Sequence, residues 1–134
     1  RDVHYPLRRQ RQMCIRDRVT VVFSISGSIE ADRLPAETTG GARIYEVRPA
    51  GVTPNFDLVD TPATVDMFAQ CWRSLIAEIE TLASVETISL VPAVPTTVAV
   101  AIGRSINASV HPAMRVYDRT GHEASYTFTM ELPR

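Results

Sequence analysis

The stretch SLVPAVPTTVAVAIGRSI, residues 89–106, decides the fold that this sequence predicts. Its first residues complete the apolar run 87–91, which indicates a short buried strand, and the prolines at 92 and 95 end that run. Residues 95–106 indicate a helix with unusually small side chains, namely Ala99, Ala101 and Gly103. Small residues let a helix lie close to a sheet, at a cost of about 1 kcal/mol for a glycine. We therefore expect a strand, a proline turn and a helix that packs back on a sheet.

Similar patterns on both sides extend this unit to a complete sheet. Further strands are predicted at residues 19–26, 43–47, 113–118 and 125–132, and a long amphipathic helix runs from Thr61-Pro62 to about residue 83. Helices alternate with strands in the middle of the chain, which is typical of a parallel sheet. The last two strands are close enough in sequence to form a hairpin. The predicted fold class is α/β, with a Rossmann-like, mainly parallel sheet, two flanking helices and a C-terminal antiparallel hairpin.

Composition limits the size and the partners of the domain. The 134 residues, 45% of them hydrophobic, suffice for one modest core. Six arginines and two aspartates lie in residues 1–18, a net charge of +4, which leaves −5 for residues 19–134. That balance argues against direct DNA or RNA binding by residues 19–134. The two cysteines indicate no disulfide framework, as in the cytoplasm, and no apolar run reaches the roughly 18–20 residues that cross a membrane.

Residues 1–18, RDVHYPLRRQRQMCIRDR, differ in composition from everything that follows. They show no periodicity, and QMCIRDR resembles translated sequencing-adapter read-through, so we interpret residues 1–18 as a non-native leader. On this interpretation residues 19–134 form one partial ligand-sensing domain, and the natural protein continues upstream of Val19. The alternative is a genuine basic arm that binds nucleic acid or a membrane.

Ligands in open α/β sheets gather at the carboxyl ends of the strands, and two such ends carry distinctive turns here. A serine and glycine turn follows the strand 19–26, where backbone N–H groups could approach a phosphate or ribose. A twin-proline turn follows the strand 87–91 and leads into a helix N-terminus, which favours an anion by about 0.3–1 kcal/mol. The candidate ligand-binding residues are Ser24, Ser26, Gly27, Ser28, Pro92, Ala93, Val94 and Pro95. The alternative is that these residues serve only as turn formers.

Further candidates are Arg104 in the second helix and Tyr117 with Asp118 at the end of the strand 113–118. Each also has an ordinary explanation, as a solvated arginine or a turn-stabilising aspartate. The histidines have no spacing that indicates a metal site, and the sequence lacks the common hydrolase, P-loop, zinc-protease and dinucleotide-binding motifs. Ser26 and His122 could be drawn as a nucleophile and a base, but such pairs arise by chance. We therefore expect binding, with no catalytic residue, no metal and no cofactor.

Several of these motifs occur together in one known family. The apolar strand, P-A-x-P turn and small-residue helix of residues 89–106 and the strand end MRVYDRTG, residues 114–121, resemble the SAVED domain. That domain is the cyclic-oligonucleotide sensor of CBASS antiphage effectors and is similar to a fused pair of CARF-like units. SISGSIEADRLP, residues 24–35, and ARIYEV, residues 42–47, match the family more weakly. The resemblance covers residues 19–132, the carboxyl-terminal portion of a full sensor.

The resemblance implies a bacterial, cytoplasmic receptor for a cyclic di-, tri- or tetranucleotide. Binding would promote homo-oligomerisation and switch on a fused nuclease, protease, NAD-cleaving enzyme or membrane-disrupting segment, with a pocket built from both halves of the sensor or between protomers. The charge of −5 requires backbone donors or local arginines to hold such a ligand; these are Arg33, Arg43, Arg48, Arg104, Arg115 and Arg119. The alternatives are a small α/β hydrolase or transferase fragment that uses Ser26 or Asp118, and a non-catalytic oligomerisation module.

Overall fold

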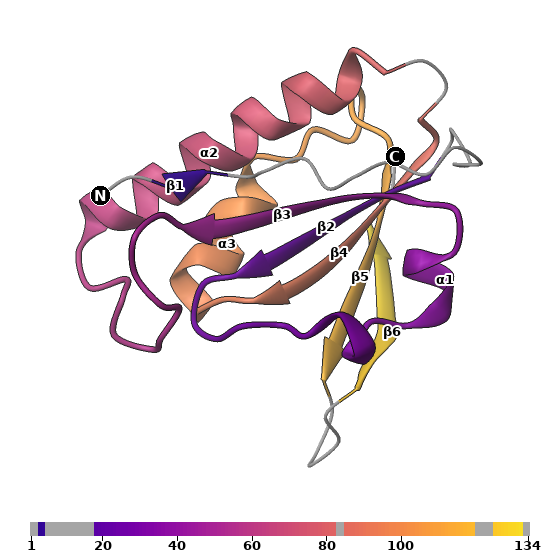
Figure 1. Cartoon of the computed structure of the whole chain (residues 1–134). Helices are drawn as coiled ribbons and strands as arrows, with labels where there is room; N and C mark the ends of the chain where they lie inside the picture. The colour runs from indigo at the N-terminus through magenta and orange to yellow at the C-terminus, as the bar shows by residue number, and fades with distance from the viewer. Residues whose placement is uncertain (1–2, 5–17, 83–84, 120–124, 133–134) are drawn as a thin grey trace.

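A computed structural model describes residues 3–4, 18–82, 85–119 and 125–132, and it contains one six-stranded sheet (Figure 1). In spatial order the strands are β1 (Val3–His4), β3 (Arg43–Pro49), β2 (Arg18–Ser24), β4 (Thr87–Ala93), β5 (Ala113–Arg119) and β6 (Tyr126–Leu132). Strands β3, β2, β4 and β5 are parallel, whereas β1 and β6 pair antiparallel with β3 and β5. The predicted α/β fold, a mainly parallel sheet with a C-terminal antiparallel pair, is confirmed.

Helices α2 (Pro62–Glu80) and α3 (Thr96–Arg104) lie side by side on one face of the sheet (Figure 1). The hydroxyl of Thr61 accepts a hydrogen bond from the backbone N–H of Thr64 at 3.2 Å, and Pro62 occupies the first turn of α2. Both features start the helix at the residue that the sequence indicated. The face of α2 toward the sheet is apolar and buried, and comprises Phe68, Ala69, Cys71, Trp72, Leu75, Ile76 and Ile79.

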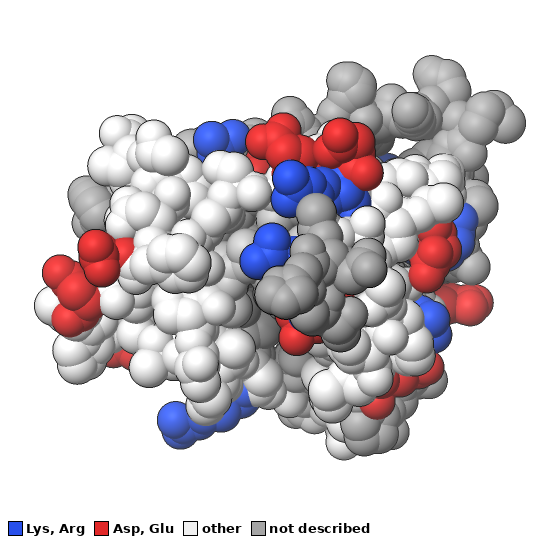
Figure 2. All heavy atoms as spheres, turned by 90° about the horizontal axis from the view of Figure 1, so that it is seen from below, with Lys and Arg blue, Asp and Glu red and all other residues white. Residues whose placement is uncertain are grey.

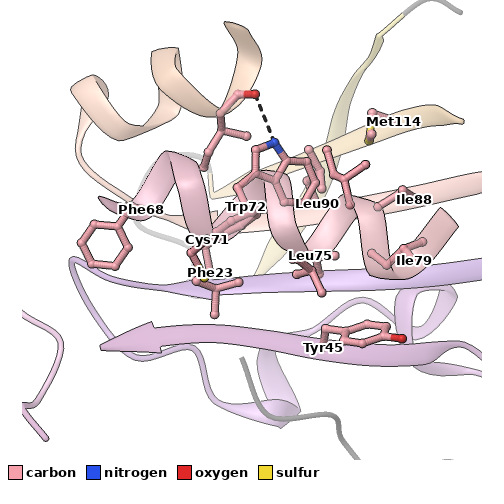
Figure 3. Close-up of a cluster of buried hydrophobic side chains, with 14 of the residues drawn as sticks. Phe23, Tyr45, Phe68, Cys71, Trp72, Leu75, Ile79, Ile88, Leu90 and Met114 are labelled. Carbon is pink, nitrogen blue, oxygen red and sulfur yellow. Dashed lines mark hydrogen bonds between the residues drawn. The ribbon is translucent and has the colours of Figure 1, made fainter. Parts of the chain in front are cut away.

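Trp72 lies at the centre of the main core, between the two helices and the sheet (Figure 3). Its side chain is fully buried, and its ring meets that of Phe23 edge to face at 5.4 Å. The indole N–H donates a hydrogen bond of 3.2 Å to the carbonyl oxygen of Ile102. One side chain therefore ties α2 to α3 and to β2, which confirms its prediction as a core residue.

The opposite face of the sheet is covered by the connection between β2 and β3. This connection contains η1 (Ala31–Arg33) and α1 (Ala36–Thr39), two short helices that the sequence did not predict. The hydroxyl of the buried Thr20 donates a hydrogen bond of 2.6 Å to the carbonyl oxygen of Thr38, which holds α1 against β2. A second, smaller core lies on this face and consists of Val22, Val91, Tyr117 and Tyr126, flanked by Ile29, Leu34 and Ile44.

Arg18 is the first residue of β2, although it falls in the segment that the sequence led us to set apart. Its guanidinium group donates a 2.6 Å hydrogen bond to the carbonyl oxygen of Gly40, just before β3. Apart from Arg18, the predicted boundary between a leader and the sensing domain stays a prediction. Among the described residues, the helices are too short or too polar to cross a membrane.

Candidate functional site

The two predicted turns meet at one edge of the sheet, where β2, β3 and β4 end, which we call the carboxyl rim (Figure 1). Ser24, the last residue of β2, is paired in register with Ala93, the last residue of β4. The carbonyl oxygen of Ala93 accepts hydrogen bonds from the backbone N–H groups of Ile25 at 3.0 Å and Ser26 at 2.8 Å. The serine and glycine turn, residues 24–28, is thus joined directly to the twin-proline turn, residues 92–95.

This junction uses backbone N–H groups that the sequence analysis expected to bind a ligand. Because Ser26 donates its N–H to Ala93, that hydrogen is not free to bind a phosphate. The next residue, Gly27, is more open, since a Cβ atom placed there would meet nothing within 4 Å. Ser28 is exposed, while Ser26 and Gly27 are partly buried. The backbone at Gly27 and Ser28 is therefore the part of this turn that a ligand can approach.

Ser24 faces the protein interior. Its side chain is buried; the hydroxyl donates a 2.9 Å hydrogen bond to Oε2 of Glu46 and accepts a 3.3 Å hydrogen bond from the N–H of Ile29. The other oxygen of Glu46 lies 3.6 Å from Nη1 of Arg48. Both hydrogen-bonding functions of Ser24 are thus used to hold Glu46 and the loop after β2. Glu46 was not singled out by the sequence.

The twin-proline turn leads into α3 as expected. Pro95 precedes the helix with φ −69° and ψ 161°, and its carbonyl oxygen accepts hydrogen bonds from the N–H groups of Val98 and Ala99. No side chain caps this helix start. A hollow of about 460 Å³ lies between the starts of α2 and α3, and Val59, Asp60, Thr61, Pro62, Val65, Asp66 and Thr97 line it. The carboxylates of Asp60 and Asp66 in this lining would repel an anionic ligand on the helix side of the rim.

Tyr117 and Asp118 occupy the carboxyl end of β5. Tyr117 is buried in the second core, and its hydroxyl donates a 3.4 Å hydrogen bond to Oε2 of Glu37. Asp118 is exposed, and its Oδ1 accepts a 2.8 Å hydrogen bond from the N–H of Arg119. Both side chains therefore have partners within the protein.

Arg104 is not brought together with these residues. It is the last residue of α3, which begins at the carboxyl rim and runs back along the sheet for nine residues, about 13 Å. There it lines a groove of about 780 Å³ outside α2 and α3, together with Asp66 and Arg73. Any contact of Arg104 with a ligand belongs to this groove.

Arginines gather beside the carboxyl end of β5. Burial raises the pKa of the Tyr126 phenol, the guanidinium of Arg119 lowers it, Asp118 raises it, and Arg33 also lowers it. Arg119 is paired in register with Tyr126, and Arg33 ends η1, in the connection that covers the face of the sheet opposite the helices. Figure 2 shows the molecule from below, where arginine and acidic side chains lie next to each other beside a broad uncharged area. The sequence analysis named both arginines but gave no indication that both influence the phenol of Tyr126.

Two other arginines of the predicted set are used elsewhere. The guanidinium of Arg115 lies 4.0 Å from the ring centre of Phe128 and 3.5 Å from Oε1 of Glu131. Arg43 begins β3, at the edge of the sheet opposite the carboxyl rim. Of the named arginines, Arg33, Arg48 and Arg119 are therefore the ones near the ends of the strands.

Within the described residues, no group of three or more His, Cys, Asp and Glu side chains could hold a metal ion. His111 lies before β5, where its Nδ1 accepts a 2.9 Å hydrogen bond from the N–H of Asn107. His122, the base once considered for Ser26, falls outside the described residues.

Solved structures of a known receptor share this fold. The chain aligns with a structure of the Acinetobacter baumannii Cap4 SAVED/CARF-domain containing receptor with the cyclic trinucleotide 3'3'3'-cAAA, at a TM-score of 0.78 and 14% identity over 98% of this chain. It also aligns with a structure of that receptor with 2'3'3'-cAAA, at a TM-score of 0.68 and 15% identity over 88% of this chain. The chain spans only 28% and 25% of those two receptor chains.

No curated protein sequence matches the chain. The model of one protein family, described as SAVED, "SMODS-associated and fused to various effectors sensor domain", matches residues 3–132. Because the match covers nearly the whole chain, this protein belongs to the SAVED family of sensor domains.

Proposed function

We propose that this chain is part of a receptor that senses a cyclic oligonucleotide second messenger and switches on an antiphage effector. The family is described as a sensor domain, and the Cap4 receptor of the same fold has been solved with cyclic trinucleotides. The observation that carries the proposal is the junction at Ala93. It brings the serine and glycine turn and the twin-proline turn to one rim, where the sheet presents backbone and hydroxyl groups together.

The proposed ligand contacts are divided between backbone and guanidinium groups. Gly27 and Ser28 offer the accessible backbone of the first turn, and residues 93–95 border it from β4. Arg33 and Arg119, near the end of β5, supply positive charge against the phosphates. Ser24 and Tyr117 act indirectly, because their hydroxyl groups hold Glu46 and Glu37. Asp118 remains a proposed ligand residue because its side chain is exposed at the carboxyl end of β5.

The receptor function also involves parts that this chain does not contain. Because the chain spans about a quarter of the receptors it resembles, we propose that the pocket is completed by the rest of the receptor or by a neighbouring copy. Ligand binding would then promote homo-oligomerisation in the cytoplasm. This portion would bind the ligand, and a fused nuclease, protease or NAD-cleaving segment would carry out the chemistry. The competing proposals are a small α/β hydrolase or transferase fragment and a non-catalytic oligomerisation module.

Isothermal titration calorimetry of a complete receptor that contains this sensor portion, against cyclic di-, tri- and tetranucleotides, tests the proposal. We expect saturable heat with at least one cyclic ligand and none with linear triadenylate, because only the ring presents its phosphates in a fixed arrangement. Light scattering on the same samples should show a larger species when that ligand is added. A complete receptor that gives no heat with any ring overturns the proposed function.

A further inference from the structure

The loop between β3 and α2 exposes a large aromatic side chain. Phe56 is 84% exposed, the highest fraction among the large apolar side chains of the described residues. Its neighbours behave differently, since Pro54 is buried and Leu58 and Val59 pack against the main core. The loop therefore has access to the core on both sides of Phe56 and still directs this ring to the solvent.

The exposed ring is carried by an ordered turn. The side chain of Asn55 donates a 2.9 Å hydrogen bond to the carbonyl oxygen of Thr53 and accepts one of 2.9 Å from the N–H of Asp57. The N–H of Leu58 adds a 3.3 Å hydrogen bond to the carbonyl oxygen of Asn55. Such an Asx turn restrains the backbone on both sides of Phe56. A restrained aromatic side chain loses little conformational entropy when it binds a partner.

The same turn is attached to the carboxyl rim. The N–H of Asn55 donates a 3.1 Å hydrogen bond to the carbonyl oxygen of Ile25, whose own N–H is bonded to Ala93. Phe56 is thus one residue from a backbone contact with the serine and glycine turn. Three segments, residues 24–28, 53–58 and 92–95, are joined in a continuous hydrogen-bonded path. A single exposed phenylalanine needs no explanation, but an ordered one at a proposed nucleotide site does.

We propose that Phe56 stacks on a nucleobase of the ligand bound at the carboxyl rim, an inference that rests on the function proposed above. A phenyl ring has no hydrogen-bonding group, so it recognises a base through stacking and apolar contact and not through the hydrogen-bonding edge of the base. Aromatic stacking on bases tolerates different sequences, because every base offers such a face. Phe56 therefore contributes affinity for the base, while phosphates are held by backbone and arginine groups.

Four variants of that complete receptor, titrated with 3'3'3'-cAAA or with whichever ring it binds, test this role. Phe56→Ala should weaken binding about tenfold, which corresponds to ~1.4 kcal/mol and lies within the range for base stacking. Phe56→Leu keeps an apolar side chain without a ring and should lose nearly as much, whereas Phe56→Tyr should bind like the unchanged chain. Val100→Ala truncates another exposed apolar side chain, on α3, and should have no effect.

A spectroscopic variant measures stacking directly. Trp72 is the only tryptophan of this chain and is fully buried, so Phe56→Trp adds one exposed indole, read as the difference from the unchanged receptor. We expect 3'3'3'-cAAA to quench the fluorescence of that indole on saturation. Unchanged affinity of Phe56→Ala, or binding without quenching, overturns the role of Phe56 and leaves the receptor function standing. Absence of binding of every cyclic di-, tri- and tetranucleotide by the unchanged receptor overturns the proposed function itself, and the role of Phe56 with it.

Discussion

The backbone N–H of Ser26 donates a 2.8 Å hydrogen bond to the carbonyl oxygen of Ala93, from the turn after β2 to the last residue of β4. This bond places two turns that are 67 positions apart in sequence against each other. It also consumes a donor that would otherwise face the solvent. The rim can thus be ordered before any ligand arrives, and the ligand must be held by the groups that remain, at Gly27, Ser28 and the nearby arginines.

Replacing a residue in each turn should weaken ligand binding. The double variant Ser26→Ala with Pro95→Ala is expected to lose at least about tenfold in affinity, ~1.4 kcal/mol. It removes a hydroxyl at the rim and the ring that fixes the backbone before α3 at φ −69°. Calorimetry with the preferred cyclic ligand measures the loss.

A matched pair of substitutions at the opposite edge provides the control. Ser109→Ala with Pro112→Ala changes the same two residue types just before β5 begins. This control should bind the ligand with unchanged affinity. Equal affinities for both double variants would mean that the two rim turns are scaffolding only.

Neutralising Glu46 should strengthen binding of a polyanion. A carboxylate roughly 8 Å from one phosphate charge repels it by about 0.5 kcal/mol in a water-like medium, or about twofold in affinity. Glu46→Gln removes this repulsion, releases Arg48 from its 3.6 Å ion pair and still accepts the hydrogen bond of Ser24. We expect at least twofold tighter binding at about 50 mM salt and a smaller gain at about 0.5 M.

Glu131→Gln controls for the loss of an ion pair. Glu131 contacts Arg115 at 3.5 Å, near the start of β5 and away from the carboxyl rim. Its neutralisation should leave affinity unchanged within error at low salt. If Glu46→Gln weakens binding instead, the carboxylate accepts a hydrogen bond from the ligand rather than repelling it.

The parts of the fold that the sequence predicted are those with a repeating local pattern. The apolar period of α2 and the cap at Thr61 predicted that helix to within a few residues, because 19 residues contain several turns. The helices η1 and α1 span three and four residues, too few to show any period. What holds α1 in place is a contact between Thr20 and Thr38, 18 positions apart, which no local pattern reveals.

The position of the candidate site could be predicted from the sequence, whereas the roles of its individual side chains could not. Strand ends indicated the rim because parallel strands end at a common edge. The roles of Ser24 and Glu46 depend on the register of β2 against β3, in which Glu46 lies opposite Val22. Residue types alone do not set that register. Phe56 was overlooked because a lone aromatic residue in a loop has no pattern, and its exposure is a property of the tertiary structure.

Trp72→Phe should destabilise the domain without changing the rim directly. The substitution removes the hydrogen bond to the carbonyl oxygen of Ile102 and leaves space in a fully buried site. We expect a loss of about 1–3 kcal/mol in the free energy of unfolding, measured by urea denaturation. Val100→Ala, on the exposed side of α3, should stay within about 0.5 kcal/mol of the original chain. Equal midpoints for the two variants would contradict the central place of Trp72 in the core.

The free thiol of Cys71 should make stability depend on alkaline pH. Burial raises the pKa of Cys71 from its ordinary value of 9.0 to about 11, so the folded protein keeps the thiol neutral where the unfolded chain ionises. The stabilisation is complete below pH 9 and is lost as pH rises toward 11, by at most about 1.4 kcal/mol per pH unit. Urea denaturation of the Cys14→Ser chain between pH 8 and 11 should show this fall, and adding Cys71→Ala should reduce it. Parallel pH profiles for the two chains would show that the thiol titrates alike in the folded and unfolded states.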